Sequence, residues 1–227
     1  MKLTHMTKKL LIIAVGVLAI ALFFWLDLGR FLTLENLKAN HRALADYYAG
    51  HRLLMVAGFM AIYIVQTALS LPGAAILSLA AGAIFGAVMG TVFANIAATI
   101  GACLAFLVTR YLLRDAVLAR FGDRLEGINR ELEQRGLNYL LFLRLVPVFP
   151  FFLINLAAGL TRLPLRTFLL GTMVGIIPGG FVYCNAGASL ATITSLSGIV
   201  SWRVLGSFAL LGLFAQIPAL YANLKKR

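Results

Sequence analysis

After residue 52, four long stretches of the chain contain no Asp, Glu, Lys or Arg: 53–109, 145–161, 167–202 and 204–224. A helix of roughly 18 to 20 apolar residues is long enough to cross the hydrocarbon core of a bilayer, and most of these stretches reach or exceed that length. In lipid the backbone polar groups must be satisfied within the segment, so the crossing elements are helices. The pattern therefore predicts an all-α, polytopic helical membrane protein.

The first long stretch is interrupted near its start. A spanning helix is expected over 53–70, and a full helix over 91–108 follows a segment crowded with glycine and alanine. Backbone groups freed at a break must be satisfied by protein or water, so we expect a re-entrant element over 72–90. Its expected breaks are Pro72, Gly73, Gly82 and Gly86.

Prolines interrupt the second half of the chain in the same way. They divide the apolar run over 139–159 and a helix expected over 165–187, and a last helix is expected over 203–221. We therefore expect a second re-entrant element over 139–164. The residues that mark these breaks are Pro147, Pro150, Gly159 and Pro178.

An internal similarity links the two halves. Residues 76–82 (ILSLAAG) correspond to residues 153–159 (LINLAAG), and each copy has a proline upstream and a long uncharged helix downstream. If each copy is a re-entrant hairpin plus one crossing, the copies have opposite orientations. This is the inverted-repeat design of transporters that bind substrate near the bilayer midplane.

Three regions follow from this pattern. Residues 1–52 are expected to form an uncleaved anchor helix and a polar connector, 53–190 the core, and 191–227 a transmembrane helix with a basic tail. Within the core, residues 113–136 form one apolar stripe with an arginine-rich opposite face. That pattern favours an amphipathic helix in the headgroup plane over a soluble connecting helix.

The composition limits the function. Of the 227 residues 61% are hydrophobic and 12% are charged, and the formal net charge is +12. Basic residues lie just outside the apolar runs, which favours anionic lipid headgroups as partners over nucleic acid. Cys103 and Cys184 are expected to be free buried thiols, and no metal or cofactor site is expected.

The apolar runs also lack catalytic and proton-relay groups. No acidic residue lies between Asp46 and Asp115, and none follows Glu133. A proton relay inside a bilayer generally uses Asp, Glu or His, so the sequence argues against a proton-driven pump and against an enzyme.

Arg144 is the main candidate for a functional residue. It precedes Pro147 and Pro150, where a broken helix exposes free backbone amides. A guanidinium in such a place either binds a phosphate bidentately or anchors a helix at the interface. Asn155 is expected to line a polar path or to satisfy backbone groups freed by the break.

Several motifs occur in order and resemble the DedA superfamily, especially its VTT-domain branch, also called the SNARE-associated Golgi protein family. They are Pro72-Gly73, Ala81-Gly82-Ala83-Ile84-Phe85-Gly86, Arg144-x-x-Pro147-x-x-Pro150-Phe151, Asn155-x-x-Ala158-Gly159-Leu160-Thr161, Gly171-Thr172-x-x-Gly175-x-x-Pro178-Gly179 and Tyr183-x-x-x-Gly187. The resemblance covers about residues 60–190. It implies two opposed re-entrant hairpins, with Arg144 and Pro147 as the Arg-x-x-Pro of the second.

The resemblance also implies a function. Related proteins act as phospholipid scramblases or as flippases for a polyprenyl-phosphate carrier. Two departures weaken a proton-coupled mechanism: Pro150 stands where the bacterial pattern has a second arginine, and 53–109 has no acids. We therefore expect a lipid transporter in the bacterial inner membrane, with Arg144, Pro147, Pro150 and Asn155 binding substrate.

Two other functions fit the same sequence. One is an ion-coupled small-solute transporter that uses Gln66, Asn95, Asn155 and Tyr183. The other is a membrane scaffold that does not transport and binds partners through 115–135. A homo-oligomer is compatible with all three.

Overall fold

A computed structural model describes residues 33–115, 136–145 and 149–191, together with isolated positions before residue 33 and between 117 and 129. Every regular element in this part of the chain is a helix, so the predicted all-α class is confirmed there. Most of the expected helices over 10–28 and 113–136, the whole of the expected helix over 203–221, and Pro147 lie outside the described residues. The helices are α2 (Leu34–Gly50), α3 (Arg52–Ala68), α4 (Ala74–Phe85), α5 (Ala87–Leu112), the helix Gly136–Leu145, α7 (Phe151–Leu160), α8 (Leu165–Gly175) and α9 (Ile177–Ala191).

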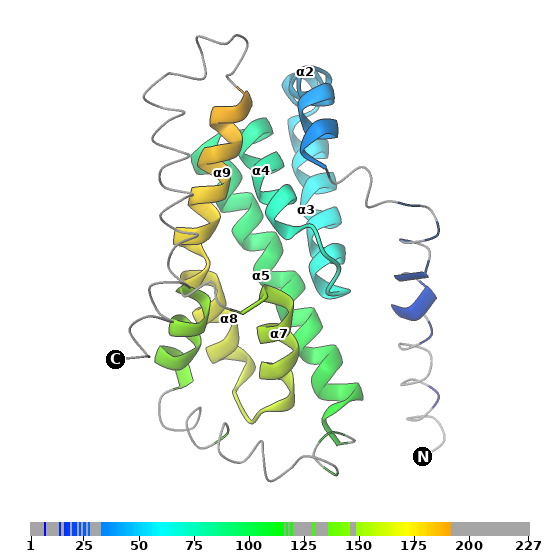
Figure 1. Ribbon diagram of the computed structural model, residues 1–227, viewed down its shortest axis with the longest axis vertical. Coiled ribbons are helices and arrows are strands. Elements are labelled where there is room, and N and C mark those ends of the chain that lie inside the picture. Colours follow the sequence, from blue (N-terminus) through cyan, green and yellow to red (C-terminus); the bar gives the residue numbers. More distant parts are fainter. Residues whose placement is uncertain are drawn as a thin grey trace.

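Helices α3 and α4 form a hairpin that packs against α5 (Figure 1). The turns at the two ends of α4 depend on glycine. Gly73 precedes α4 with φ 116°, and Gly86 separates α4 from α5 with φ 81°. A side chain is disfavoured in these conformations. Because α4 has 12 residues, it is about 18 Å long and covers only part of a hydrocarbon core about 30 Å thick.

A second hairpin joins the helix Gly136–Leu145 to α7. Leu140 shares a core with Ala158 and Leu163, whereas Arg144 contacts Phe151 and Asn155. The two helices are therefore antiparallel. The chain then continues through α8 into α9, with a bend of 40° at Ile176.

Helix α5 has the surface of a membrane helix. Among the described helices it alone is long and apolar enough to cross a membrane by itself, while α8 and α9 reach that length as a bent pair. Its buried face is rich in alanine and glycine, and large apolar residues are exposed on the opposite face. The exposed stripe is Val88, Val92, Ile96, Ile100, Leu104 and Leu107. Small residues inside and large apolar residues outside are typical of helices packed in lipid.

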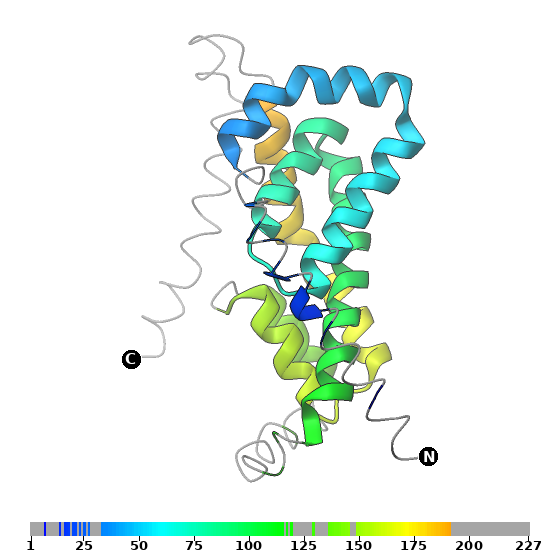
Figure 2. The ribbon, with the colours of Figure 1, turned by 90° about the vertical axis from the view of Figure 1, so that its right-hand side faces the viewer.

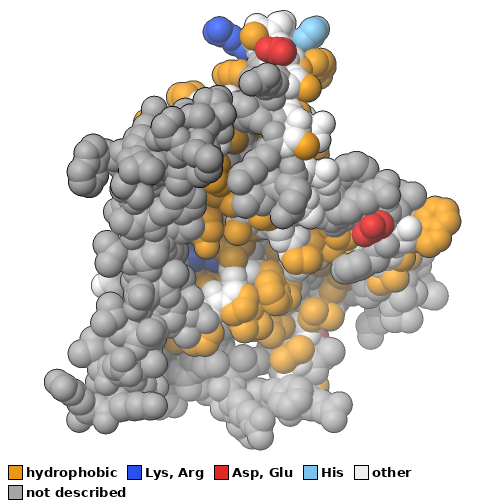
Figure 3. Space-filling model, turned by 45° about the horizontal axis from the view of Figure 1, so that its top comes forward, with side chains coloured by type: hydrophobic (Ala, Val, Ile, Leu, Met, Phe, Trp, Pro, Cys, Tyr) orange, Lys and Arg blue, Asp and Glu red, His pale blue; other side chains and the backbone are white. Residues whose placement is uncertain are grey.

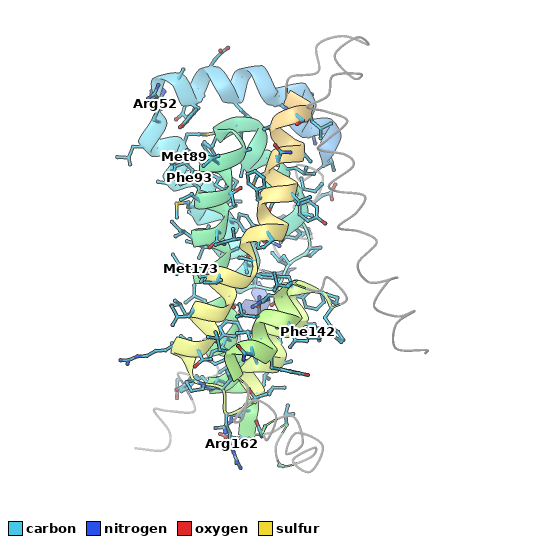
Figure 4. The ribbon with its side chains drawn as sticks, turned by 90° about the vertical axis from the view of Figure 1, so that its left-hand side faces the viewer. Arg52, Met89, Phe93, Phe142, Arg162 and Met173 are labelled. Carbon is cyan, nitrogen blue, oxygen red and sulfur yellow. The ribbon has the colours of Figure 1, made fainter. Side chains whose placement is uncertain are left out.

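The distribution of charge agrees with this placement. Figure 4 shows Arg52 at one end of the bundle and Arg162 at the opposite end, with Phe93, Phe142 and Met173 between them. Hydrophobic side chains cover much of the described surface visible in Figure 3, and basic and histidine side chains lie at the projecting end. The described bundle therefore has a largely apolar outer surface between two charged ends.

Two of the expected breaks prove to be packing contacts. Gly82 and Gly159 lie inside α4 and α7. A Cβ on Gly82 would overlap the backbone of Cys184 in α9, and one on Gly159 would lie 2.6 Å from the carbonyl oxygen of Phe106. The prediction of breaks at these two positions was wrong, because glycine here lets neighbouring backbones approach closely.

Two boundaries also differ from the prediction. The chain leaves α4 at Gly86, so α5 begins at Ala87 rather than at residue 91. The interruption expected at Pro178 lies at Ile176 instead. Pro178 occupies the first turn of α9, where the missing N–H has no intrahelical acceptor to lose.

The polar connector before α3 contains a helix that the sequence did not predict. The Thr33 hydroxyl caps α2 by accepting a hydrogen bond from the Asn36 N–H at 3.3 Å. Figure 2 shows α2 lying across the end of the bundle. Tyr48 of α2 packs edge-on against Phe85, with ring centroids 5.1 Å apart.

Candidate functional site

Arg144 lies at the centre of the bundle, near the tip of the second hairpin. Its side chain is only 7% exposed. Its Nη2 donates to Asn155 Oδ1 of α7 at 2.6 Å and to Thr172 Oγ1 of α8 at 2.9 Å. Its Nη1 lies 3.5 Å from the carbonyl oxygen of Phe151. Two further helices therefore hold the guanidinium in one position.

Aromatic rings also flank this guanidinium. Its central carbon lies 4.5 Å from the centroid of the Phe151 ring and 5.3 Å from that of Phe168. Phe168 in turn stacks on Phe106 of α5, with centroids 4.5 Å apart. Cation–π contacts of this kind strengthen when water is excluded.

One face of α8 is shaped to receive the helix that carries Arg144. A Cβ on Gly171 would lie 2.7 Å from Leu140 Cδ2, and one on Gly175 would lie 2.6 Å from Arg144 Cβ. Thr172, between these glycines, supplies an acceptor for Arg144. The Gly171-Thr172-x-x-Gly175 motif is therefore a docking face, with two glycines for close approach and one hydroxyl for the cation.

Among the residues that the structure describes, no carboxylate pairs with Arg144. Residues 53–109 and 134–227 contain no Asp or Glu. Arg144 Nε and Asn155 Nδ2 are both buried and have no hydrogen-bond partner in the part of the chain that the structure describes. Buried donors of this kind are costly unless a partner satisfies them, and a buried cation is costly unless it is paired.

A cavity of about 270 Å³ lies beside Arg144. It separates the tips of the two hairpins: Ala74, Ala75 and Ser78 of α4 line one side, and Arg144 and Phe151 line the other. The polar groups around it come from five different helices. They are Tyr63, Ser78, Asn95, Arg144 and Tyr183.

The predicted substrate-binding residues occupy different places. Arg144 lines the cavity, and Asn155 is fully buried, where it holds the guanidinium. Pro150 is exposed at the start of α7 and does not line the cavity. Pro72 is also exposed, two residues before Ala74, which does line it.

The polar residues of the alternative solute path divide into two groups. Gln66 donates to the carbonyl oxygen of Leu71 and accepts from Thr67, so it closes the turn after α3. Asn95 and Tyr183 line the cavity. Asn95 Nδ2 also donates to the carbonyl oxygen of Met173 at 3.0 Å, where the bend leaves α8 carbonyls without helical donors.

Sequence reasoning did not single out two of the groups that shape this site. Tyr63 of α3 lies 2.9 Å from Ser78 Oγ and donates to the carbonyl oxygen of Ala74 at 3.2 Å, which fixes the first hairpin beside the cavity. Thr172 accepts from Arg144. Thr172 could have been found from its place between two glycines that already suggested a close helix contact.

Arg110 is one of the basic residues just outside the apolar runs, which were expected to meet anionic lipid headgroups. Its Nη2 donates to the carbonyl oxygens of Thr161 at 2.7 Å and Leu163 at 2.8 Å, and its Nε donates to that of Gly159 at 3.3 Å. These carbonyls lie at and beyond the end of α7, where no helical donors remain. Arg110 therefore fixes the base of the second hairpin to α5.

Together, the apolar outer stripe, the short hairpins and the enclosed cation define an integral membrane protein with a polar site at its centre. The sequence pattern of the VTT domain matches residues 71–189, which is more than half of the chain. The chain therefore belongs to the VTT-domain family, as its motifs predicted.

Several curated relatives are membrane proteins by name. A Transmembrane protein 41 homolog of Dictyostelium discoideum is 30% identical over 189 residues, which are 82% of this chain and 57% of the relative. An uncharacterized membrane protein of Arabidopsis thaliana is 31% identical over 83% of this chain and 67% of its own length. Transmembrane protein 41B of Xenopus tropicalis is 25% identical over 86% of this chain and 71% of its own length. No solved structure matches the chain.

Proposed function

We propose that this protein moves lipids across the bilayer, as a scramblase or flippase for phospholipid or polyprenyl phosphate. The single observation that carries the proposal is the enclosed Arg144 guanidinium, which lines a cavity between two hairpins and has no acidic partner in the described structure. A lipid phosphate supplies the missing negative charge and several acceptor oxygens, and arginine binds phosphate bidentately.

In this proposal the protein has two re-entrant elements that belong to an inverted repeat. The first, over residues 72–90, contains α4, and the second, over residues 139–164, contains most of the helix Gly136–Leu145 and all of α7. The similarity between residues 76–82 and 153–159 supports the repeat, as do helices of 12 and 10 residues that are too short to cross a bilayer. Tips that meet at mid-depth give a polar headgroup a short route between the leaflets.

The same proposal includes the partners of the protein and the membrane in which it lies. Its partners are membrane lipids with anionic headgroups, and it performs no chemical conversion. We place it in the bacterial inner membrane, although the relatives named above are eukaryotic. The basic residues outside the apolar runs support the choice of anionic lipids.

Reconstituted liposomes provide the test. The full chain is incorporated with a fluorescent phospholipid or, separately, a labelled polyprenyl phosphate, and accessible label in the outer leaflet is bleached chemically. Transbilayer movement shows as a larger bleached fraction than in empty liposomes. Arg144→Gln is expected to reduce the rate, whereas Arg166→Ala, at the exposed end of the bundle, is expected to leave it unchanged. If neither lipid moves faster than in empty liposomes, the proposal is wrong.

A further inference from the structure

A second cavity lies within the second hairpin, between the helix Gly136–Leu145 and α7. Its volume is about 320 Å³, which is in the range of about 300–1,000 Å³ common for ligand pockets. Side chains such as Leu140, Leu153, Ala157 and Leu163 line it, and among its described lining residues only Thr161 and Tyr139 have polar side chains. This space, the hairpin cleft, is suited to hydrocarbon.

The hairpin cleft adjoins the cavity at Arg144. Leu143, Phe149 and Ile154 line both spaces, so a single layer of side chains separates them. Leu143 is also the residue directly before Arg144. A polar anchoring group and an apolar slot therefore lie next to each other in the same hairpin.

The buried donors beside the cavity at Arg144 require a hydrogen-bond acceptor. Arg144 Nε and Asn155 Nδ2 are buried donors without partners in the described structure, and no carboxylate is available from the surrounding helices. Charge complementarity therefore selects an anionic ligand, and the apolar slot beside it selects one that carries a hydrocarbon chain.

We propose that the hairpin cleft holds one hydrocarbon chain of an anionic lipid while the phosphate of that lipid is bound at Arg144. The inference rests on the proposed function and adds to it the place where the hydrocarbon chain of the lipid is bound. Only one chain is accommodated between the helices, and any second chain stays in the bilayer.

The free energy of moving a hydrocarbon chain from the bilayer into the hairpin cleft determines how the proposal is tested. A chain that leaves the bilayer for an apolar cleft gains little, because lipid tails are as apolar as the cleft. Occupancy therefore depends on the phosphate bound to Arg144. A neutral lipid with the same chain has no such anchor and enters the cleft less often.

Photo-crosslinking distinguishes these cases. The full chain is purified in dodecyl maltoside micelles, which contain no phosphate, and receives palmitoyl lysophosphatidic acid that carries a diazirine in its chain, or the matching monoacylglycerol, which lacks the phosphate. Labelled residues are located by mass spectrometry. Leu104 and Leu107, on the exposed stripe of α5, report the chance labelling of a lipid-facing surface.

The expected result has three parts. For each probe, labelling of the hairpin cleft is divided by labelling of Leu104 and Leu107 on α5. This ratio is expected to be at least about fivefold higher for the phosphate probe than for the neutral probe. Ala157→Phe fills the cleft and lowers that labelling by at least about fivefold, the lower end of what overfilling an occupied space costs. Phe152→Trp, on an exposed face of the same helix and outside both cavities, changes it little.

Three results overturn the inference. They are equal cleft labelling by the two probes, no cleft labelling by either probe, or cleft labelling that Ala157→Phe leaves unchanged. The first would indicate a general lipid site, and the second a cleft occupied by another segment of the chain. The probe comparison uses the wild-type protein, so it holds even if a variant fails to fold. Liposome transport is measured separately, so loss of transport with intact cleft labelling rejects the proposed function alone.

Discussion

Arg110 on α5 donates a hydrogen bond to the carbonyl oxygen of Thr161 at 2.7 Å, although the two residues lie 51 positions apart. Thr161 is the C-cap of α7, where a helix leaves carbonyls without donors. A cation at this end also interacts favourably with the negative end of the helix dipole. The base of the second hairpin is therefore fixed to the long helix by a charged group, while its tip carries Arg144.

Arg110→Ala is expected to lower the free energy of unfolding by about 2–4 kcal/mol, because three carbonyls lose a charged donor. Arg110→Lys should recover part of this loss, since an ammonium keeps the charge but not the planar geometry. The measurement is the thermal midpoint of the purified protein in detergent. Arg166→Ala, at an exposed position near the same end, is the control and should stay within about 0.5 kcal/mol of wild type.

Arg144 and Asn155 are expected to be energetically coupled. Asn155→Leu in the wild type removes an acceptor from a buried cation and should cost about 2–3 kcal/mol. In an Arg144→Met background the cation is absent, so the same change should cost at least about 1 kcal/mol less. A double-mutant cycle on thermal unfolding measures the difference. Costs that simply add would show that this hydrogen bond contributes nothing to stability.

Close packing of α4 on α9 should not tolerate even one methyl group at Gly82. An added Cβ overlaps the backbone of Cys184, which cannot rotate away as a side chain can. Gly82→Ala is therefore expected to destabilise the fold by at least about 2 kcal/mol. Gly58→Ala in α3 is the matched control, because nothing lies within 4 Å of its Cβ. That change should be neutral or stabilise by up to about 1 kcal/mol. Size-exclusion profiles after heating distinguish the two variants.

The choice of Arg144 as a candidate residue and the break between α3 and α4 could be made from the sequence because both depend on local chemistry. Pro72 followed by Gly73 is typical of a turn between helices, and an arginine inside an apolar run stands out against its neighbours. The confirmed helical class has the same origin, since uncharged runs of this length form helices in lipid.

The partners of Arg144 could not be predicted in this way. Thr172 lies 28 positions from Arg144, and no periodicity shows which hydroxyl of α8 faces it. Gly82 and Gly86 look alike in the sequence, yet one contacts another helix and the other ends its own. The difference comes from tertiary contacts, so a small-residue pattern predicts close packing or a break but does not distinguish them.

Gly175 provides a way to displace Arg144 without changing its charge. A Cβ at Gly175 would lie 2.6 Å from Arg144 Cβ, so Gly175→Ala must push the arginine stem away from α8 and loosen its bond to Thr172. If the position of the guanidinium matters for lipid movement, transport in liposomes should fall about tenfold, because about 1.4 kcal/mol of misplacement corresponds to that factor. Gly180→Ala is the matched control: Gly180 lines the same cavity, but nothing lies within 4 Å of its Cβ. Equal loss in both variants would show that cavity volume, and not the position of Arg144, controls the rate.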